Sequence, residues 1–264
     1  MSAGFTYDGH HSDEYGVYLR AKPMDLVSQS RSTEFAIPGR PGRKVVRTEA
    51  DVRTVKLQLD FTNRDNQEGT SASIMANLEA LAALIDPEKG DRALTFDDRP
   101  GRKLMAQLEG QNEVVRQILH GTGEITMRAT APPYWLGNPR TVSWSTTASG
   151  QSMVLMNAGT KETPFKVTVR ARALSGGAAV GVGASPQFWL LTVAGKSVGF
   201  NGALTLTDVL EVDTGALTVT LNGQNALNRW TGGFPKLPPG AVTLRQTGYT
   251  YGAIHSFDLD ERYT

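Results

Sequence analysis

Histidine, cysteine and paired carboxylates are the residues that most often perform acid–base, nucleophilic or metal chemistry, and this chain offers few of them. Cysteine is absent, which excludes a thiolate nucleophile, a thiolate-bound metal and any disulfide. Two histidines are adjacent, so on an extended chain they would point to opposite sides, and no HExxH pattern accompanies them. We therefore interpret the histidines as surface residues. They are His10, His11, His120 and His255.

Neighbouring carboxylates occur at Asp97 and Asp98. Neighbours on a strand diverge, whereas the carboxyl pair of a glycosidase converges at ~5 to 9 Å across a cleft, so we predict turn residues at the mouth of a hairpin. Asp258, Asp260 and Glu261 could line one side of a strand, but a calcium site needs more oxygen ligands in a shaped loop, which favours a solvated final strand. No GxSxG, Ser-His-Asp order or dinucleotide fingerprint is present. The sequence thus predicts no enzyme, no cofactor and no metal site.

Residues 37–43, IPGRPGR, are rich in glycine and arginine, a composition that can bind phosphate. The segment lacks the GxxxxGK[ST] pattern, and the residues after it have the pattern of a strand rather than a helix. A long β-hairpin with a Pro-Gly turn is favoured, and we expect its tip to act in assembly by meeting carboxylates of a neighbouring subunit. The candidate assembly contacts are Ile37, Pro38, Gly39, Arg40 and Arg43.

Aromatic side chains suggest a second kind of site. On a β-sandwich they can stack on sugars, although they more often fill the core between the two sheets. Trp189 and Trp230 lie in the second half of the chain and are the candidate glycan-stacking residues. Tyr134, Trp135 and Trp144 flank the proposed domain boundary.

The first half of the sequence predicts antiparallel strands and one helix. Residues 55–61 alternate apolar and polar side chains, the pattern of a half-buried strand. Apolar residues spaced by four, three and four from Ile74 to Ile85 predict a helix that Ser71 or Ser73 caps and Pro87 ends. Together with a hairpin around DDRPGR and further strands, this is an α+β layer. The strand candidates after the helix are 93–96, 103–110, 112–121 and 123–130.

The second half changes character. Short strand candidates recur about every 10 to 14 residues with turn residues between them, and no helix of useful length interrupts them, as in a β-sandwich. Residues 174–187, rich in Gly and Ala, are predicted to form a mobile loop. The strand candidates are 141–147, 153–159, 165–173, 188–195, 203–207, 209–214, 216–223 and 241–248.

Composition supports a division into two domains. The 264 residues are 39% hydrophobic and 20% charged, enough for two medium cores. Residues 1–131 hold 17 Lys/Arg and 19 Asp/Glu, whereas 132–264 hold 10 and 7, and this change coincides with APP at 131–133. We predict domains at 1–131 and 132–264. A net charge of +1 gives no basic field for nonspecific DNA binding, and the absence of a secretory pattern and of a long apolar segment predicts cytoplasmic synthesis without membrane insertion.

Four motifs in the first half, in this order and around a single helix, resemble the distal tail proteins of long-tailed bacteriophages. The resemblance covers residues 5–137, and FPKLPPGAVTL at 234–244 extends it weakly into the second half. It implies a mainly β fold: an N-terminal α+β domain, with an antiparallel sheet and one helix, followed by a C-terminal galectin-like β-sandwich. The motifs are FTYDG with YGVYL, IPGRPGR, LTFDDRPGRKLMAQLEG and GEITMRATAPPYWLG.

The resemblance also implies a function. Distal tail proteins form a hexameric ring beneath the tail tube, so this chain is expected to be a structural hub at the virion tail tip. Its partners would be copies of itself, the tail tube protein and a tail-associated or tail-fibre protein, with DNA crossing the lumen only in transit. Strands at 55–61 and 123–130 would expose edges that a ring could cover. A carbohydrate-binding module for host cell-surface adhesion and a cell-wall hydrolase remain alternatives.

Overall fold

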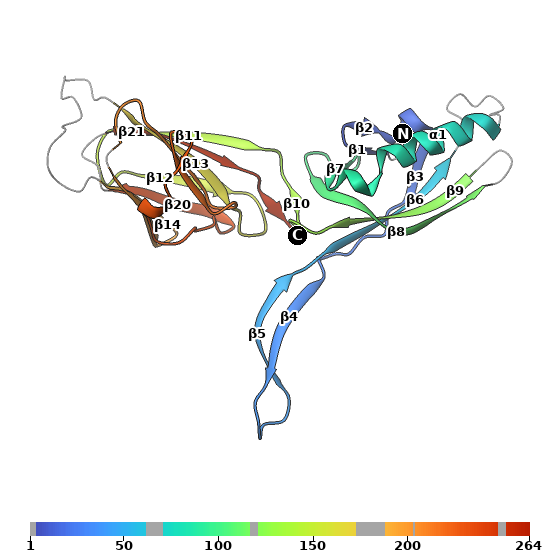
Figure 1. Cartoon of the computed structure of the whole chain (residues 1–264), viewed down its shortest axis with the longest axis horizontal. Coiled ribbons are helices and arrows are strands. Elements are labelled where there is room, and N and C mark those ends of the chain that lie inside the picture. The colour runs from blue at the N-terminus through green and yellow to red at the C-terminus, as the bar shows by residue number, and fades with distance from the viewer. Residues whose placement is uncertain (1–3, 62–70, 117–120, 173–187, 203, 248–251) are drawn as a thin grey trace. The chain divides into compact units, whose positions relative to one another are not determined.

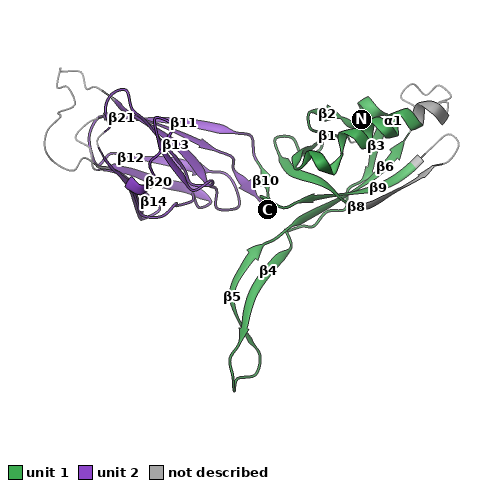
Figure 2. Cartoon of the chain, in the orientation of Figure 1, with its two compact units in different colours: residues 1–136, 264 green, residues 137–263 purple. Residues whose placement is uncertain are grey.

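The computed structural model describes residues 4–61, 71–116, 121–172, 188–202, 204–247 and 252–264. The chain forms two compact units, residues 1–136 with residue 264 and residues 137–263 (Figure 2). The sequence predicted a boundary after residue 131; in the structure Trp135 and Leu136 are buried, Leu136 pairs with Lys103, and unit 1 extends to residue 136. No helix among the described residues is long and apolar enough to cross a membrane.

Unit 1 is an antiparallel sheet with the strand order β2-β1-β7-β8-β9-β6-β3, and β10 pairs with β8. Helix α1 (Ser71–Leu84) lies across one face of the sheet (Figure 1). Two 3-10 turns, η1 (Ser12–Tyr15) and η2 (Pro87–Lys89), connect these elements. The strands are β1 (Phe5–Tyr7), β2 (His10–His11), β3 (Val17–Ala21), β6 (Arg53–Phe61), β7 (Arg92–Phe96), β8 (Lys103–Arg116), β9 (Gly121–Ala129) and β10 (Trp135–Leu136).

The core of unit 1 follows the sequence pattern. Alternate residues of β6 from Val55 to Phe61 are buried and the intervening ones are wetted, which confirms the period-two prediction. The predicted helix is confirmed, with Leu81 and Ile85 buried against the unit and Pro87 beginning the next turn. The side chains of residues 71–74, including the predicted caps, lie outside the described part of the structure.

Two strand predictions in unit 1 are wrong. Segments 103–110 and 112–116 are not separate strands; they form the single strand β8, which continues through an irregularity where Gly110 takes a φ of 74° and the register shifts between Glu109 and Glu113. Residues 117–120 lie outside the described part of the chain. Strands β6 and β9 are not edges either. Strand β6 pairs with both β3 and β9, and β9 pairs with β6 and β8, so their hydrogen-bonding edges are already covered.

Unit 2 is a β-sandwich of two antiparallel sheets. One has the order β11-β21-β13-β16-β17-β18 and the other β12-β20-β14-β15-β19. Their strands are β11 (Arg140–Thr146), β12 (Ser152–Asn157), β13 (Phe165–Arg172), β14 (Phe188–Val193), β15 (Lys196–Asn201), β16 (Val209–Asp213), β17 (Thr218–Leu221), β18 (Gln224–Asn225), β19 (Trp230–Thr231), β20 (Gly240–Thr247) and β21 (Gly252–Leu259), and β22 (Arg262–Tyr263) follows.

The inward faces of the two sheets share one apolar core, which includes Leu155, Val167, Leu191, Val212 and Leu244. Alternation along each strand places these residues inside and polar ones outside, as the sequence rhythm predicts. Residues 204–207 form no strand, although Leu204 is buried in the core. The predicted mobile loop at 174–187 lies outside the described residues.

Candidate assembly interface

A two-stranded hairpin, called here the arm, is the most unusual feature of unit 1. It consists of β4 (Ser30–Ala36) and β5 (Arg43–Ala50), which pair only with each other among the strands that the structure describes. All of β4 and residues 43–48 of β5 are exposed, so the arm does not fold back onto its own unit (Figure 1). A register shift between Thr33 and Glu34 leaves Val46 as the extra residue of a bulge. The predicted long hairpin is thereby confirmed.

The arm continues the ladder of the sheet below it. Beyond β3, Met24 bridges Val55, and Lys56 donates its backbone N–H to the carbonyl of Pro23 (2.9 Å). Nearer the arm, Gln29 donates to the carbonyl of Val52 (2.7 Å). Because these bonds link the β3–β6 pair to the β4–β5 pair, the arm is an extension of the sheet rather than a tethered loop.

The tip of the arm is a turn built on glycine. The backbone N–H of Arg40 donates to the carbonyl of Ile37 (3.0 Å), and Gly39 and Gly42 take φ values of 79° and 90°. Residues with a Cβ rarely adopt such φ values, which explains the glycines of this motif. Pro38, Gly39 and Arg40 are exposed and Ile37 is half-buried. The structure thus presents the predicted tip residues to solvent.

Ion pairs within the arm are exposed and weak. Arg43 lies 3.9 Å from Glu34, and Arg31 lies 3.5 Å from Glu49, which also pairs with Arg47. Exposed pairs of this kind contribute about 0 to 1 kcal/mol each, so they leave these arginines available to other carboxylates. Among the described residues, no ion pair involves Arg40.

Apolar side chains are exposed beside these charges. Phe35, Val45 and Val46 are 46%, 50% and 63% exposed along the arm, and Leu26 and Val27 are exposed at its base. Isolated apolar residues are normal on a surface, but several of them close together on a projecting two-stranded sheet suit an interaction surface. The arm therefore carries both exposed apolar groups and exposed basic groups.

A buried guanidinium lies at the base of the arm. Arg53, the first residue of β6, is 1% exposed, and its Nε and Nη2 have no hydrogen-bond partner among the described residues. Burial lowers the pKa of Arg53, the charge of Arg99 lowers it further, and Asp25 opposes these effects. Arg99 itself lies over the Trp135 ring at 4.8 Å. This part of unit 1 holds two cations against one carboxylate.

The two candidate glycan-stacking tryptophans have different environments. Trp189 is 0% exposed and fills the core, the commoner of the two roles considered, because it lies on the same inward face of β14 as Leu191 and Val193. Trp230 is half-buried, stacks on Phe234 with ring centroids 5.8 Å apart, and donates its Nε1–H to the carbonyl of Gly233 (3.2 Å). Of the two candidates, Trp230 is therefore the one that is partly exposed.

The prediction that all four histidines are surface residues is also wrong, because His255 is 0% exposed. Its Nδ1 donates to the carbonyl of Trp144 (3.3 Å), and its Nε2 accepts the Nε1–H of Trp189 (3.1 Å). Burial lowers the pKa of His255 from 6.5 to about 4, and the bond to the Trp144 carbonyl opposes this effect. The signal was present in the sequence, because strand alternation puts His255 on the same side as Phe257 and Leu259.

Among the described residues, the other histidines and the adjacent aspartates form separate surface pairs. His10 and His11 have acidic neighbours, Glu14 at 3.0 Å for the first and Asp97 at 3.3 Å for the second, and His120 lies outside the described residues. Asp98 instead pairs with Lys22, so the two adjacent aspartates diverge as predicted. Within the described ranges, no three His, Asp or Glu side chains are grouped as metal ligands.

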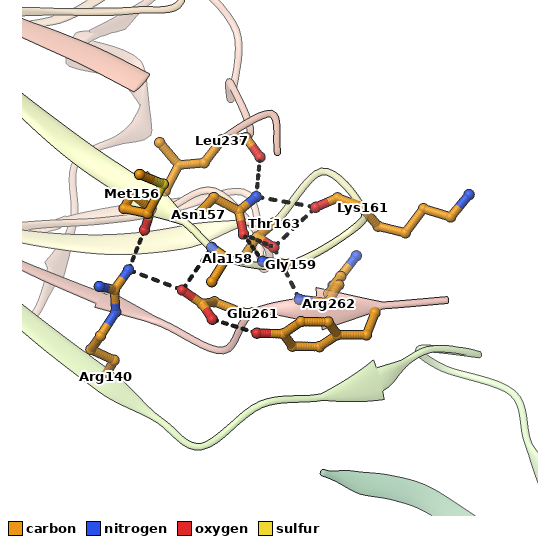
Figure 3. A network of polar contacts seen from close by, with 11 residues as sticks. Arg140, Met156, Asn157, Ala158, Gly159, Lys161, Thr163, Leu237, Glu261 and Arg262 are labelled. Atoms are coloured by element: carbon orange, nitrogen blue, oxygen red, sulfur yellow. Dashed lines mark hydrogen bonds and ion pairs between the residues drawn. The ribbon is translucent and has the colours of Figure 1, made fainter. Parts of the chain in front are cut away.

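Glu261 is not a solvated strand residue, contrary to the prediction; it joins several segments of the sandwich (Figure 3). Its carboxylate accepts hydrogen bonds from Arg140 Nη2 (3.0 Å), the backbone N–H of Ala158 (3.1 Å) and the hydroxyl of Tyr263 (2.6 Å). Its carbonyl accepts the N–H of Gly137 (2.7 Å). The first and last residues of unit 2 are therefore fastened together.

Asn157 extends this network at the end of β12 (Figure 3). Its Nδ2 donates to the carbonyl of Leu237 (2.9 Å), and its Oδ1 accepts from the N–H of Gly159 (3.0 Å) and the hydroxyl of Thr163 (3.3 Å). Thr163 Oγ1 in turn accepts the N–H of Arg262 (3.1 Å). Buried polar groups that are satisfied in this way fix one arrangement of the loops.

The sequence and the fold were compared with those of known proteins. No family model matches the chain, and no curated protein matches it by sequence. Among solved structures, the Dit protein (gp19.1) of phage SPP1 is similar over 98% of this chain and 98% of that chain, with a TM-score of 0.73 and 15% identity. The chain has the Dit fold. A chain of the phage P2 baseplate, in its activated conformation with calcium, aligns with 9% identity over 97% of this chain and 98% of that chain, but its TM-score of 0.43 is too low to support a conclusion.

The Dit fold agrees with the mainly β architecture that the motifs predict. The SPP1 protein is described as a paradigm of the hub adsorption apparatus in phages that infect Gram-positive hosts. At 15% identity the likeness establishes the fold and leaves the function to be argued from this chain's own surfaces.

Proposed function

We propose that this chain is a structural, non-enzymatic hub protein of a phage tail tip, and that its first unit closes with copies of itself into a ring, most simply of six subunits. The ring connects the tail tube protein with a tail-associated or tail-fibre protein, and DNA crosses its lumen only in transit. The protein is made in the host bacterial cytoplasm and resides at the tail tip of the virion.

The observation that carries the proposal is the likeness to SPP1 Dit over nearly the whole of both chains, with a TM-score of 0.73. The arm supports it independently, because an exposed extension that carries Phe35, Val46 and several arginines suits contact with another subunit. Among the strands that the structure describes, β2 and β3 stand at the two ends of the main sheet of unit 1, and a closed ring can cover their outer edges.

The alternatives have less support. A carbohydrate-binding module loses Trp189, which is buried. A cell-wall hydrolase would need convergent carboxylates, whereas Asp97 and Asp98 bind different partners. Glycan-array binding by the intact protein, or turnover of cell-wall material that a carboxylate substitution abolishes, would favour these alternatives.

The test is the assembly state of the purified full-length protein. Mass photometry over a range of concentrations should show a discrete oligomer, and negative-stain images should show rings with a central opening. The same measurements are repeated after the tail tube protein is added. A chain that stays monomeric throughout would contradict the proposal.

A further inference from the structure

The outward face of helix α1 is apolar where a solvent-facing helix is normally charged. Among residues 75–84, Glu79 is the only charged residue. A surface helix ordinarily carries polar residues opposite its buried stripe, and a helix that is apolar on all sides is normally covered. The exposed residues of this face are Met75, Ala76, Glu79, Ala80, Ala82 and Ala83.

Acidic residues border the far end of this helix. Residues 79–91 contain four Asp/Glu and one Lys, a net charge of −3. The lysine, Lys89, donates a hydrogen bond to the carbonyl of Ala83 and so caps the C-terminal end of the helix. The segment thus presents an apolar surface next to a negative one.

The arm has the opposite charge and a matching apolar character. Residues 30–50 contain five Lys/Arg and two Asp/Glu, a net charge of +3. On the arm, Phe35 stands opposite Lys44 in the register, so an apolar and a basic side chain share one face. Complementary charge fixes the orientation of a contact, and the apolar side chains supply area to bury.

We propose that the arm of one copy docks on the outward face of α1 in the next copy. This inference rests on the proposed ring and names the surface that receives the arm. Seven residues of β4 at about 3.3 Å each give the arm a reach of roughly 23 Å, enough to span to a neighbouring subunit. Since the arm and the α1 face are different patches of the same chain, the contact is head-to-tail, the kind that closes into rings.

Because the chain has no cysteine, single introduced cysteines test the contact directly. One preparation of the full chain carries Val46→Cys in the arm, and a second carries Ala80→Cys on α1. The two preparations are mixed and treated with a short bis-maleimide. The mixture should give at least about tenfold more covalent dimer than either preparation gives when it is treated alone. Val154→Cys, on an exposed side chain of unit 2 (62%), replaces Ala80→Cys in the matched control and should give no such dimer.

Mass photometry of the same mixtures separates the possible failures. If oligomers form but Val46→Cys and Ala80→Cys give no specific cross-linked dimer, this inference is overturned and the proposed ring is not. Monomers at every concentration would overturn both.

A second variant tests the α1 face without a cross-linker. Ala80→Arg keeps a strong helix former on an exposed position and should leave the melting temperature unchanged while weakening assembly at least about tenfold. Ala241→Arg, exposed on β20, is the matched control and should assemble normally. Equal assembly of both variants would overturn the inference.

Discussion

Acid should destabilise the sandwich through His255. The folded state lowers the pKa of this ring from 6.5 to about 4, because burial disfavours the charged form more than the bond to the Trp144 carbonyl favours it. The unfolded chain therefore binds a proton near pH 6.5 while the folded chain stays neutral, and stability is lost as the pH falls from 6.5 to 4. At 1.36 kcal/mol per pKa unit, the loss approaches roughly 3 kcal/mol at pH 4.

The assay is urea unfolding of the full chain between pH 7.5 and 4.5, followed by near-ultraviolet circular dichroism. Three of the four tryptophans lie in unit 2, so this signal reports mainly on the sandwich. His255→Gln serves as the reference, because glutamine offers a donor and an acceptor but does not titrate. Carboxylates titrate in both proteins, and the difference between them isolates the histidine.

The wild-type protein should lose its stability advantage over His255→Gln progressively below pH 6.5. A difference in unfolding free energy that stays constant from pH 7.5 to 4.5 would refute the reasoning. An imidazole pKa at or above 6.5, measured on His255 by NMR titration, would refute it as directly.

Three further predictions concern the arm, the loops and the domain limits. Replacing Arg40 and Arg43 by alanine should weaken the association of subunits, by about 2 to 5 kcal/mol where both arginines meet buried carboxylates. The monomer's melting temperature should stay nearly unchanged. Sedimentation measures the association and calorimetry the melting temperature. Gly159→Ala should destabilise the sandwich by about 1 to 3 kcal/mol in urea melts, because a Cβ there would lie 2.5 Å from the carbonyl oxygen of Arg262. Residues 137–263 expressed alone should give a cooperative, β-rich monomer by circular dichroism and light scattering, and an insoluble fragment would show that the unit limits are wrong.

Local sequence patterns predicted the individual strands and the helix better than they predicted which strands pair with each other. Alternation along 55–61 indicated a strand with one buried face, and the structure agrees, but it could not show that β3 and β9 cover both edges. Strand pairing depends on contacts between distant segments, which a single sequence does not display. The continuity of β8 through Gly110 was missed for a related reason, since a glycine in a strand fits a turn or a bulge equally well.

In the candidate sites, too, features set by local sequence were predicted and features set by contacts between distant segments were not. The glycines and arginines of the tip predicted an exposed turn, because their backbone preferences are local. The burial of Trp189 and His255 depends on which faces of the two sheets meet, which the residue type alone does not determine. Glu261 was missed because its partners are as far away in sequence as Arg140.

The hydrogen bond between Gly137 and Glu261 holds the two ends of unit 2 next to each other, so that unit 2 can be exchanged as a whole domain. A domain whose first and last residues are adjacent can be inserted into, removed from or replaced in another chain with little change to the host fold. Mutations that remodel the outer surface of the sandwich can then accumulate without altering residues 1–136. In evolutionary terms, one unit can vary quickly while the other is conserved.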